Sequence, residues 1–351
     1  MNASSTTASS SPVTVLIASY LEVDQVARIE AAFHGRVRVV YEPGLLPIPR
    51  YSGDHNGVAR DLDEADQRRW HGLLAAADVL FDFDWADPAA MARNCPRLRW
   101  VQATSAGIGE FLLQTRLAES GFLFTTATGV HAVPLAEFVV LGLLYFVKNV
   151  PWLRQQQARH AWERHTTGLL AGRRLLIIGL GNVGREIARM CGSFGVEVSG
   201  VDPAFSEPPE GVARLVDTKD LSSALCHTDA LVLACPYTKD THHLIGFPEL
   251  AAIRSGALLV NVSRGRVIDE LALIEALERG RLGGAVLDVF DHEPLPADSP
   301  LWDMPNVLIS PHSASTVSGQ NKHIVDLFID NLERYLQGLP LRNVFVTATG
   351  Y

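Results

Sequence analysis

The stretch RLLIIGLGNVGREIARMCGSFGVEVSGVDP, Arg174 to Pro203, runs in the order strand, glycine turn, helix, strand, acidic residue. This order is the layout of a βαβ unit that binds a dinucleotide. Leu175 to Ile178 is a short aliphatic run, typical of a strand buried on both faces. We expect a helix over about 182–194, whose first amides and positive dipole end would face a pyrophosphate. A second strand is expected over 196–201.

The turn holds glycines in GxGxxG spacing at Gly179, Gly181 and Gly184. The first permits a sharp turn, the second lets the backbone approach a pyrophosphate, and the third lets the helix pack closely on the strand. A glycine turn alone is weak evidence, because such turns also occur for structural reasons. The flanking strand and helix, with Asp202 ending the second strand, favour nucleotide binding over a structural turn.

Asp202 also predicts which dinucleotide is bound. A carboxylate at this position accepts hydrogen bonds from the ribose hydroxyls, and it would repel the 2′-phosphate of NADP. The residues that follow, Pro203, Ala204 and Phe205, include no Arg or Lys that would bind that phosphate. The sequence therefore predicts NAD as the cofactor, with NADP as the less favoured alternative.

The composition predicts a soluble globular protein of two domains, with 351 residues, 47% hydrophobic and 20% charged. The formal net charge of −9 argues against nucleic acid or an anionic membrane as the main partner. The apolar segment 132–147 is too short to span a bilayer and is expected to be a helix buried between layers. Residues 1–11 lack the features of a secretory signal and are expected to be a disordered polar tail.

The cysteines show no CxxC spacing, which excludes a disulfide framework or zinc site, and no metal is predicted. We interpret them as buried thiols in a reducing, cytoplasmic compartment. They are Cys95, Cys191, Cys226 and Cys235.

The alternation of strand and helix predicts an α/β fold of two doubly wound parallel-sheet domains with a cleft between them. A flavodoxin-like substrate domain is expected over 12–130 plus 316–351, and a Rossmann domain over 131–315. The expected strands are 13–18, 37–41, 79–83, 98–103, 122–126, 230–234, 257–262, 284–290 and 307–310. The expected helices are 24–33, 65–76, 88–95, 110–119 and a long amphipathic one over 317–337.

Charged groups follow three successive strands of the second domain. Arg264 follows the strand ending near Val262, Asp288 and Glu293 belong to the next strand end, and His312 follows the last strand. Ligands of open α/β sheets bind at this carboxyl edge. Reduction of a 2-oxo acid needs a cation for the carboxylate, a polarising group for the ketone oxygen and a proton donor. An Arg and a His supported by a Glu meet these needs.

The motifs GLGNVG, CPYTKDTHHLIG, NVSRGRVIDE, LDVFDHEP and PHSAST occur in this order. With them the chain resembles the D-isomer-specific 2-hydroxyacid dehydrogenase family from about Val13 to Phe345. The resemblance implies that His312 is the acid/base, that Glu293 supports it and that Arg264 binds substrate. It implies a cofactor site at Gly179, Gly181, Asn182, Val183, Gly184, Asp202, Cys235, Pro236, Val262, Ser263 and Asp288, and a substrate-carboxylate loop at Ser105, Ala106 and Gly107.

Some assignments keep an alternative. Asp288 is expected to hold the nicotinamide carboxamide, but it could instead fix its own loop.

Many family members have an Asp two residues after the substrate loop, where this chain has Gly109, so a helix cap is lost. Trp152 and Trp162 are interface candidates, since the family dimerises through the region before the glycine turn.

The resemblance implies NAD-dependent reduction of a small 2-oxo acid such as glyoxylate or hydroxypyruvate. Glu293, where formate dehydrogenases carry Gln, argues against formate. A non-catalytic NAD(H)-binding regulator of the corepressor kind and a phosphite dehydrogenase remain the alternatives.

Overall fold

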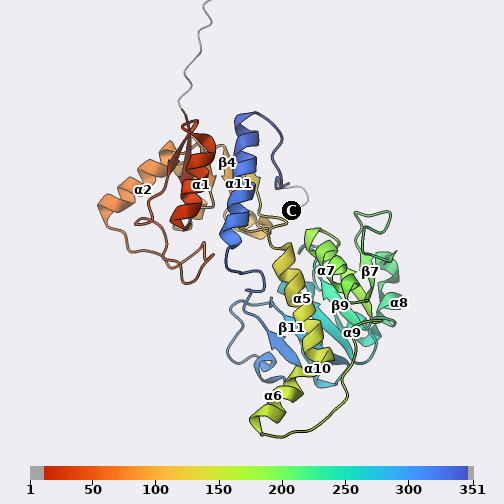
Figure 1. The fold of residues 1–351 in the computed structure, drawn as a ribbon. Helices are drawn as coiled ribbons and strands as arrows, with labels where there is room; N and C mark the ends of the chain where they lie inside the picture. The colour runs from red at the N-terminus through yellow and green to blue at the C-terminus, as the bar shows by residue number, and fades with distance from the viewer. Residues whose placement is uncertain (1–11, 347–351) are drawn as a thin grey trace, which may run out of the picture. The chain divides into compact units, whose positions relative to one another are not determined.

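The computed structural model describes residues 12–346, so the predicted tail over 1–11 lies outside the described residues. The chain divides into two compact units, one formed by residues up to Val130 together with those from Val317 onward, and one by His131–Thr316. Each unit is an α/β structure around one parallel sheet (Figure 1). The predicted fold class, two parallel-sheet α/β domains, is confirmed.

The sheet of unit 1 has five strands in the order β2-β1-β3-β4-β5. They are β1 (Val13–Ile17), β2 (Val37–Val40), β3 (Val79–Phe81), β4 (Trp100–Gln102) and β5 (Leu123–Thr125). All neighbouring pairs are parallel. The strand order changes direction between β1 and β3, and the crevice for a ligand lies outside the carboxyl ends at such a switch point.

The helices of unit 1 include one that arrives from the C-terminal part of the chain. They are α1 (Val23–Phe33), α2 (Glu64–Ala76), η1 (Pro88–Ala90), α3 (Met91–Asn94), α4 (Gly109–Gln114), η2 (Leu117–Glu119) and α11 (Gln320–Leu336). Phe328 of α11 packs edge-on against Phe81 and stacks on Trp100, with ring centroids 5.2 and 5.4 Å apart. Residues 317–346 therefore complete the core of unit 1.

The helix predicted over 110–119 is interrupted. It divides into α4 and the 3₁₀ helix η2 at Arg116, whose φ is 60°. A residue other than glycine in this left-handed region ends a right-handed helix. The α4 helix starts without a side-chain cap, as expected from the missing Asp.

The sheet of unit 2 has seven parallel strands in the order β12-β11-β10-β9-β6-β7-β8. They are β6 (Arg174–Ile178), β7 (Glu197–Val201), β8 (Arg214–Leu215), β9 (Ala230–Leu233), β10 (Ala257–Asn261), β11 (Leu282–Leu287) and β12 (Val307–Ile309). Its order changes direction between β6 and β9, because β7 and β8 extend on one side of β6 and β9 to β12 on the other.

Helices cover both faces of this sheet (Figure 1). They are α5 (Ala132–Val147), α6 (Val150–Ala158), α7 (Asn182–Ser193), η3 (Thr218–Asp220), α8 (Leu221–Leu225), α9 (Phe247–Ala252), η4 (Gly265–Val267), α10 (Glu270–Glu278) and η5 (Pro300–Asp303). Apolar residues of α5 and α7 pack on one face, and those of α8, α9 and α10 pack on the other. Among the described helices, none alone is long and apolar enough to cross a membrane. The pair α5 and α6, with a bend of 62° between them, reaches the length and apolar composition of a membrane span when the two helices are taken together.

Two predictions about local structure are wrong. The strand predicted over 284–290 runs instead over Leu282–Leu287. It leaves the ladder early because the Phe290 N–H donates to the Glu293 carboxylate. Cys226 is exposed, unlike the other cysteines, because it ends the short helix α8.

Candidate active site

The three glycines of the predicted nucleotide turn differ in what surrounds them. Gly179 has a φ of +95°, and a Cβ there would lie 2.5 Å from the Cys235 nitrogen. A Cβ on Gly184 would lie 1.9 Å from the Gly179 oxygen, so this glycine lets α7 pack on the turn. A Cβ on Gly181 would meet nothing within 4 Å. The turn and the packing require the first and third glycines, whereas the space beside the second is open.

The start of α7 is suited to bind an anion. Its N-cap is Gly181 and no side chain caps its first amides, while Asn182 and Val183 form its first turn. The unpaired amides and the helix dipole favour a phosphate at this position. The residues at this end of the unit therefore fit the pyrophosphate of a dinucleotide.

Asp202 follows β7 at the same carboxyl edge of the sheet. Its Oδ2 accepts a hydrogen bond from the Leu180 N–H at 2.7 Å, and its Oδ1 accepts one from the Ala204 N–H at 2.9 Å. The carboxylate therefore fixes the glycine turn as well as the loop after β7. Each carboxylate oxygen has a second lone pair with which it can accept from a ribose hydroxyl.

Three further residues predicted to bind the cofactor are buried at the ends of neighbouring strands. Cys235 follows β9 and Val262 and Ser263 follow β10, and each of the three is at least nine-tenths buried. Burial raises the pKa of the Cys235 thiol to about 12, so the thiol is neutral and unreactive. Pro236 is exposed at the same strand end.

Asp288 fixes the loop that carries His312. Its Oδ1 accepts hydrogen bonds from the Ser310 hydroxyl at 2.6 Å and from the Ser313 and Ala314 N–H groups at 2.8 and 2.9 Å. Its backbone oxygen accepts the His312 N–H at 2.8 Å. Asp288 thus has the loop-fixing role that the sequence left as the alternative. Its second carboxylate oxygen, Oδ2, accepts no hydrogen bond from the residues that the structure describes.

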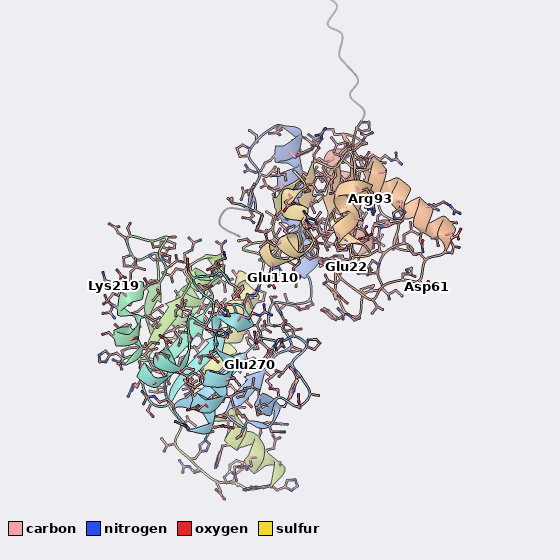
Figure 2. The ribbon with its side chains drawn as sticks, turned by 180° about the vertical axis from the view of Figure 1, so that it is seen from behind. Glu22, Asp61, Arg93, Glu110, Lys219 and Glu270 are labelled. Atoms are coloured by element: carbon pink, nitrogen blue, oxygen red, sulfur yellow. The ribbon has the colours of Figure 1, made fainter. Side chains whose placement is uncertain are left out.

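His312 and Glu293 form the contact expected of an acid/base pair. His312 Nδ1 lies 2.8 Å from Glu293 Oε2, and the His312 backbone has a φ of 51°. The Phe290 N–H donates to Glu293 Oε1 at 3.0 Å, and Glu270, labelled in Figure 2, accepts the Asp291 N–H at 3.2 Å. Burial opposes ionisation of Glu293, but hydrogen bonding and the charge of His312 outweigh it, so the pKa of Glu293 is lowered.

Arg264 lies in the loop next to this pair. A Cβ on Gly265 would lie 1.9 Å from the Phe290 carbonyl, so the loop after β10 packs directly on the loop that carries Glu293. The Arg264 guanidinium also lowers the pKa of Glu293 electrostatically, although burial and the His312 contact act more strongly. Unit 2 therefore brings together the three residues predicted to be catalytic.

Asn261 is a positioning residue that sequence reasoning missed. It is 1% exposed, its Nδ2 donates to the Arg264 oxygen at 3.1 Å, and its Oδ1 accepts from the Ser263 N–H and hydroxyl. An Asn at a strand end favours an Asx turn, in which its side-chain oxygen accepts the N–H two residues later, and this signal would have pointed to Asn261.

The predicted substrate loop lies in unit 1, after β4. Ser105, Ala106 and Gly107 are exposed, and the Ser105 oxygen accepts the Ala127 N–H at 2.9 Å. Helix α4, which carries Glu110 (Figure 2), begins directly after the loop. In the long loop before α2, Arg50 forms an ion pair with Asp54 at 2.7 Å and so packs within its own loop.

Comparison with known proteins identifies the family. Residues 140–314 match the model of the D-isomer specific 2-hydroxyacid dehydrogenase NAD binding domain. The chain is 31% identical over 274 residues to glyoxylate/hydroxypyruvate reductase B of Pectobacterium carotovorum, covering 76% of this chain and 85% of the relative. The chain belongs to the D-isomer-specific 2-hydroxyacid dehydrogenase family. Its sequence-based recognition is thereby confirmed.

Another relative in the family is longer than this chain. D-3-phosphoglycerate dehydrogenase of Methanocaldococcus jannaschii is 32% identical over 245 residues, which is 68% of this chain but 46% of that protein. The chain therefore matches about half the length of that relative.

Solved members of the 2-hydroxyacid dehydrogenase family share the fold over nearly the whole chain. A family protein from Aeromonas salmonicida superposes with a TM-score of 0.80 at 30% identity, covering 96% of this chain and 100% of that one. The NADPH-dependent glyoxylate/hydroxypyruvate reductase of Sinorhizobium meliloti, solved with NADP and sulfate, gives 0.76 at 26% identity, covering 97% and 100%. Family membership therefore leaves the choice between NAD and NADP open.

Proposed function

We propose that this chain is an NAD-dependent oxidoreductase that interconverts a small 2-oxo acid and its D-2-hydroxy acid. The observation that carries the proposal is the 2.8 Å contact between His312 and Glu293. This pair of side chains lies near Arg264, whose charge acts on Glu293. The same unit carries the glycine turn, where the space beside Gly181 is open.

The proposed dinucleotide site consists of the glycine turn, the first turn of α7, Asp202 and the buried walls formed by Cys235, Pro236, Val262 and Ser263. The free oxygen of Asp288 would accept a hydrogen bond from the nicotinamide carboxamide. When bound, the nicotinamide supplies or accepts the hydride.

The protein residues would do the remaining work. Arg264 binds the substrate carboxylate and polarises the carbonyl, together with the loop of Ser105, Ala106 and Gly107. His312 donates a proton from Nε2 to the ketone oxygen during reduction and takes it back during oxidation. Glu293 accepts from Nδ1, which orients the ring and stabilises its protonated form.

The test is oxidation of NADH with a panel of 2-oxo acids, namely glyoxylate, hydroxypyruvate, pyruvate, 2-oxoisocaproate and phenylpyruvate. We expect turnover with glyoxylate or hydroxypyruvate, as in the reductase relatives. If the protein binds NADH but reduces no member of the panel, the proposal is wrong, and a regulator or a phosphite dehydrogenase is favoured instead. Oxidation of phosphite by NAD then separates these two.

The cofactor preference is tested by substitution of Asp202. We expect the wild-type enzyme to prefer NADH to NADPH by about 100-fold in kcat/KM, because the carboxylate repels the 2′-phosphate. Asp202→Asn removes this repulsion and should reduce the preference by about tenfold. The ratio of the two rates is the measurement, since general damage to the turn affects both cofactors alike. An unchanged ratio would mean that Asp202 does not select the cofactor.

The Glu293 carboxylate predicts a pH-dependent stability difference. A group whose pKa is lowered by folding stabilises the protein above its unfolded pKa, and the effect disappears as the pH falls through the folded value. Glu293→Gln should therefore lower Tm by about 2 °C at neutral pH, since the side chain is one-third exposed. The difference in Tm between wild type and variant should shrink and then vanish as the pH falls below 4.5, the ordinary pKa of a glutamate. Thermal unfolding across this range checks it, and a pH-independent difference would contradict it.

We also propose a homodimer formed through unit 2. The Trp162 side chain, beyond α6, is 95% exposed and Leu169 is 70% exposed, and side chains of this kind are enriched in interfaces. Trp162→Asp should weaken dimerisation by about 100-fold, as measured by light scattering over a dilution series. Trp302→Asp, on the same unit, is the control. A wild-type monomer at every concentration would refute the dimer.

A further inference from the structure

A strained, buried acidic residue directly follows strand β3 at the switch point of the unit 1 sheet. Asp82 is 1% exposed and its φ is 70°. Asp tolerates the left-handed region better than most residues, but single residues held there and buried often mark functional positions. The mechanism proposed above does not use this carboxylate.

The carboxylate of Asp82 accepts one hydrogen bond on each of its oxygens. The Thr104 N–H donates to Oδ1 at 3.4 Å, and the Trp85 indole N–H donates to Oδ2 at 2.8 Å. The Asp82 N–H itself donates to the Gln102 oxygen at 2.7 Å. Asp82 thus contacts the end of β4 through its backbone and the loop after β4 through its side chain.

Thr104 is the residue directly before Ser105, where the proposed substrate loop begins. A further fixed point of the loop is the hydrogen bond from the Ala127 N–H to the Ser105 oxygen. Trp85, held by Asp82, packs against Phe111 of α4 with ring centroids 5.1 Å apart. Asp82 therefore connects β3 with both segments that flank the loop.

We propose that Asp82 is a positioning residue that orders Ser105, Ala106 and Gly107 for binding of the 2-oxo acid carboxylate. This role rests on the proposed function of the loop. We expect an effect on substrate binding and not on hydride transfer, because the side-chain hydrogen bonds of Asp82 lead to Thr104 and Trp85, on either side of the route to the substrate loop.

A second buried carboxylate provides a matched control. Asp84, two residues later, is 2% exposed and accepts an indole N–H from Trp70 at 3.2 Å. It also accepts the Ala86 N–H, on the same oxygen, Oδ1. Asp84 makes no hydrogen bond to the substrate loop in the described part of the chain.

The two sites respond differently to replacement of the carboxylate by an amide. An Asn has one acceptor oxygen and one donor NH₂ group. In Asp82→Asn one of the two donated N–H groups faces that NH₂ and loses its partner. In Asp84→Asn the single oxygen can keep the hydrogen bonds from Trp70 and Ala86, and only the weaker one from the Asp87 backbone is exposed to loss. Asp82→Gly, which relieves the positive φ and removes both acceptors, serves as a second variant.

The experiment measures two properties of each variant in the full-length protein: steady-state kinetics with the best 2-oxo acid of the panel, and hydrogen exchange of the amides from Thr104 to Gly107. For Asp82→Asn and Asp82→Gly we expect KM for the 2-oxo acid to rise about tenfold, with kcat and KM for NADH changed by less than about threefold. The loop amides should exchange about tenfold faster. Asp84→Asn should change neither property.

The outcomes are distinct. Unchanged exchange in both Asp82 variants, or faster exchange without a rise in KM, overturns the proposal, and so does an equal effect of Asp84→Asn. A wild-type protein that reduces no 2-oxo acid refutes the proposed function and with it the substrate role, whereas the exchange data still decide whether Asp82 orders the loop.

Discussion

His312→Ala is expected to lower kcat for 2-oxo acid reduction by about 1,000-fold while the affinity for NADH changes little. The substitution removes the proton donor and leaves the Glu293 carboxylate without the His312 contact at 2.8 Å. It does not alter the glycine turn or the hydrogen bonds of Asp202. Steady-state oxidation of NADH gives kcat, and the fluorescence of bound NADH gives the affinity.

The matched control is His292→Ala. His292 is the neighbour of Glu293, is largely exposed and lies 3.5 Å from the Asp291 carboxylate. Its replacement should leave kcat within about twofold, as for other surface substitutions. Full activity in the His312 variant would show that His312 is not the acid/base, and loss of NADH binding in it would show that the residue acts on the cofactor instead.

Gly184→Ala is expected to abolish NADH binding and to destabilise unit 2 by about 3 kcal/mol or more. The added Cβ would lie 1.9 Å from the Gly179 oxygen, and neither backbone segment can move away without opening the turn. Thermal unfolding and NADH titration measure the two effects separately.

Two other glycines separate packing from ligand binding. Gly181→Ala meets no protein atom within 4 Å, so Tm should stay within about 2 °C, but NADH affinity should fall by about tenfold or more because the methyl group occupies the pyrophosphate space. Gly192→Ala, also without a neighbour within 4 Å and inside α7, should raise Tm slightly, since Ala favours helix more than Gly does. Unchanged NADH affinity in Gly181→Ala would place the cofactor elsewhere.

The nucleotide turn was predictable because its causes are local. Three closely spaced glycines, one with φ of +95°, join an aliphatic strand to a helix, and all three signals are within a few residues of each other. The long amphipathic helix α11 was likewise predicted from its spacing, although it begins at Gln320 and not at 317.

The limits of β11 were not predicted correctly, because they depend on packing and hydrogen bonds that the apolar pattern of the sequence does not show. The strand was predicted to begin at Gly284, but it begins two residues earlier, at Leu282. Gly284 packs closely on α5, because a Cβ there would lie 2.8 Å from the Phe146 ring. Val289 and Phe290 continue the apolar run, but the Phe290 N–H donates to Glu293 and not to a neighbouring strand.

The sequence alone determined the fold class and the nucleotide turn and singled out Arg264, Glu293 and His312 as candidate catalytic residues, because these follow from periodicity and from short motifs at strand ends. The tertiary structure decided how they are supported. Asp288 fixes the His312 loop, Asn261 fixes the Arg264 loop, and Asp82 contacts the residue before the substrate loop. Asn261 begins the motif NVSRGRVIDE, but the resemblance implied no role for it, and Asp82 lies in none of the motifs that carry the resemblance. All three roles depend on hydrogen bonds to backbone atoms that only the packed sheet edges bring within reach.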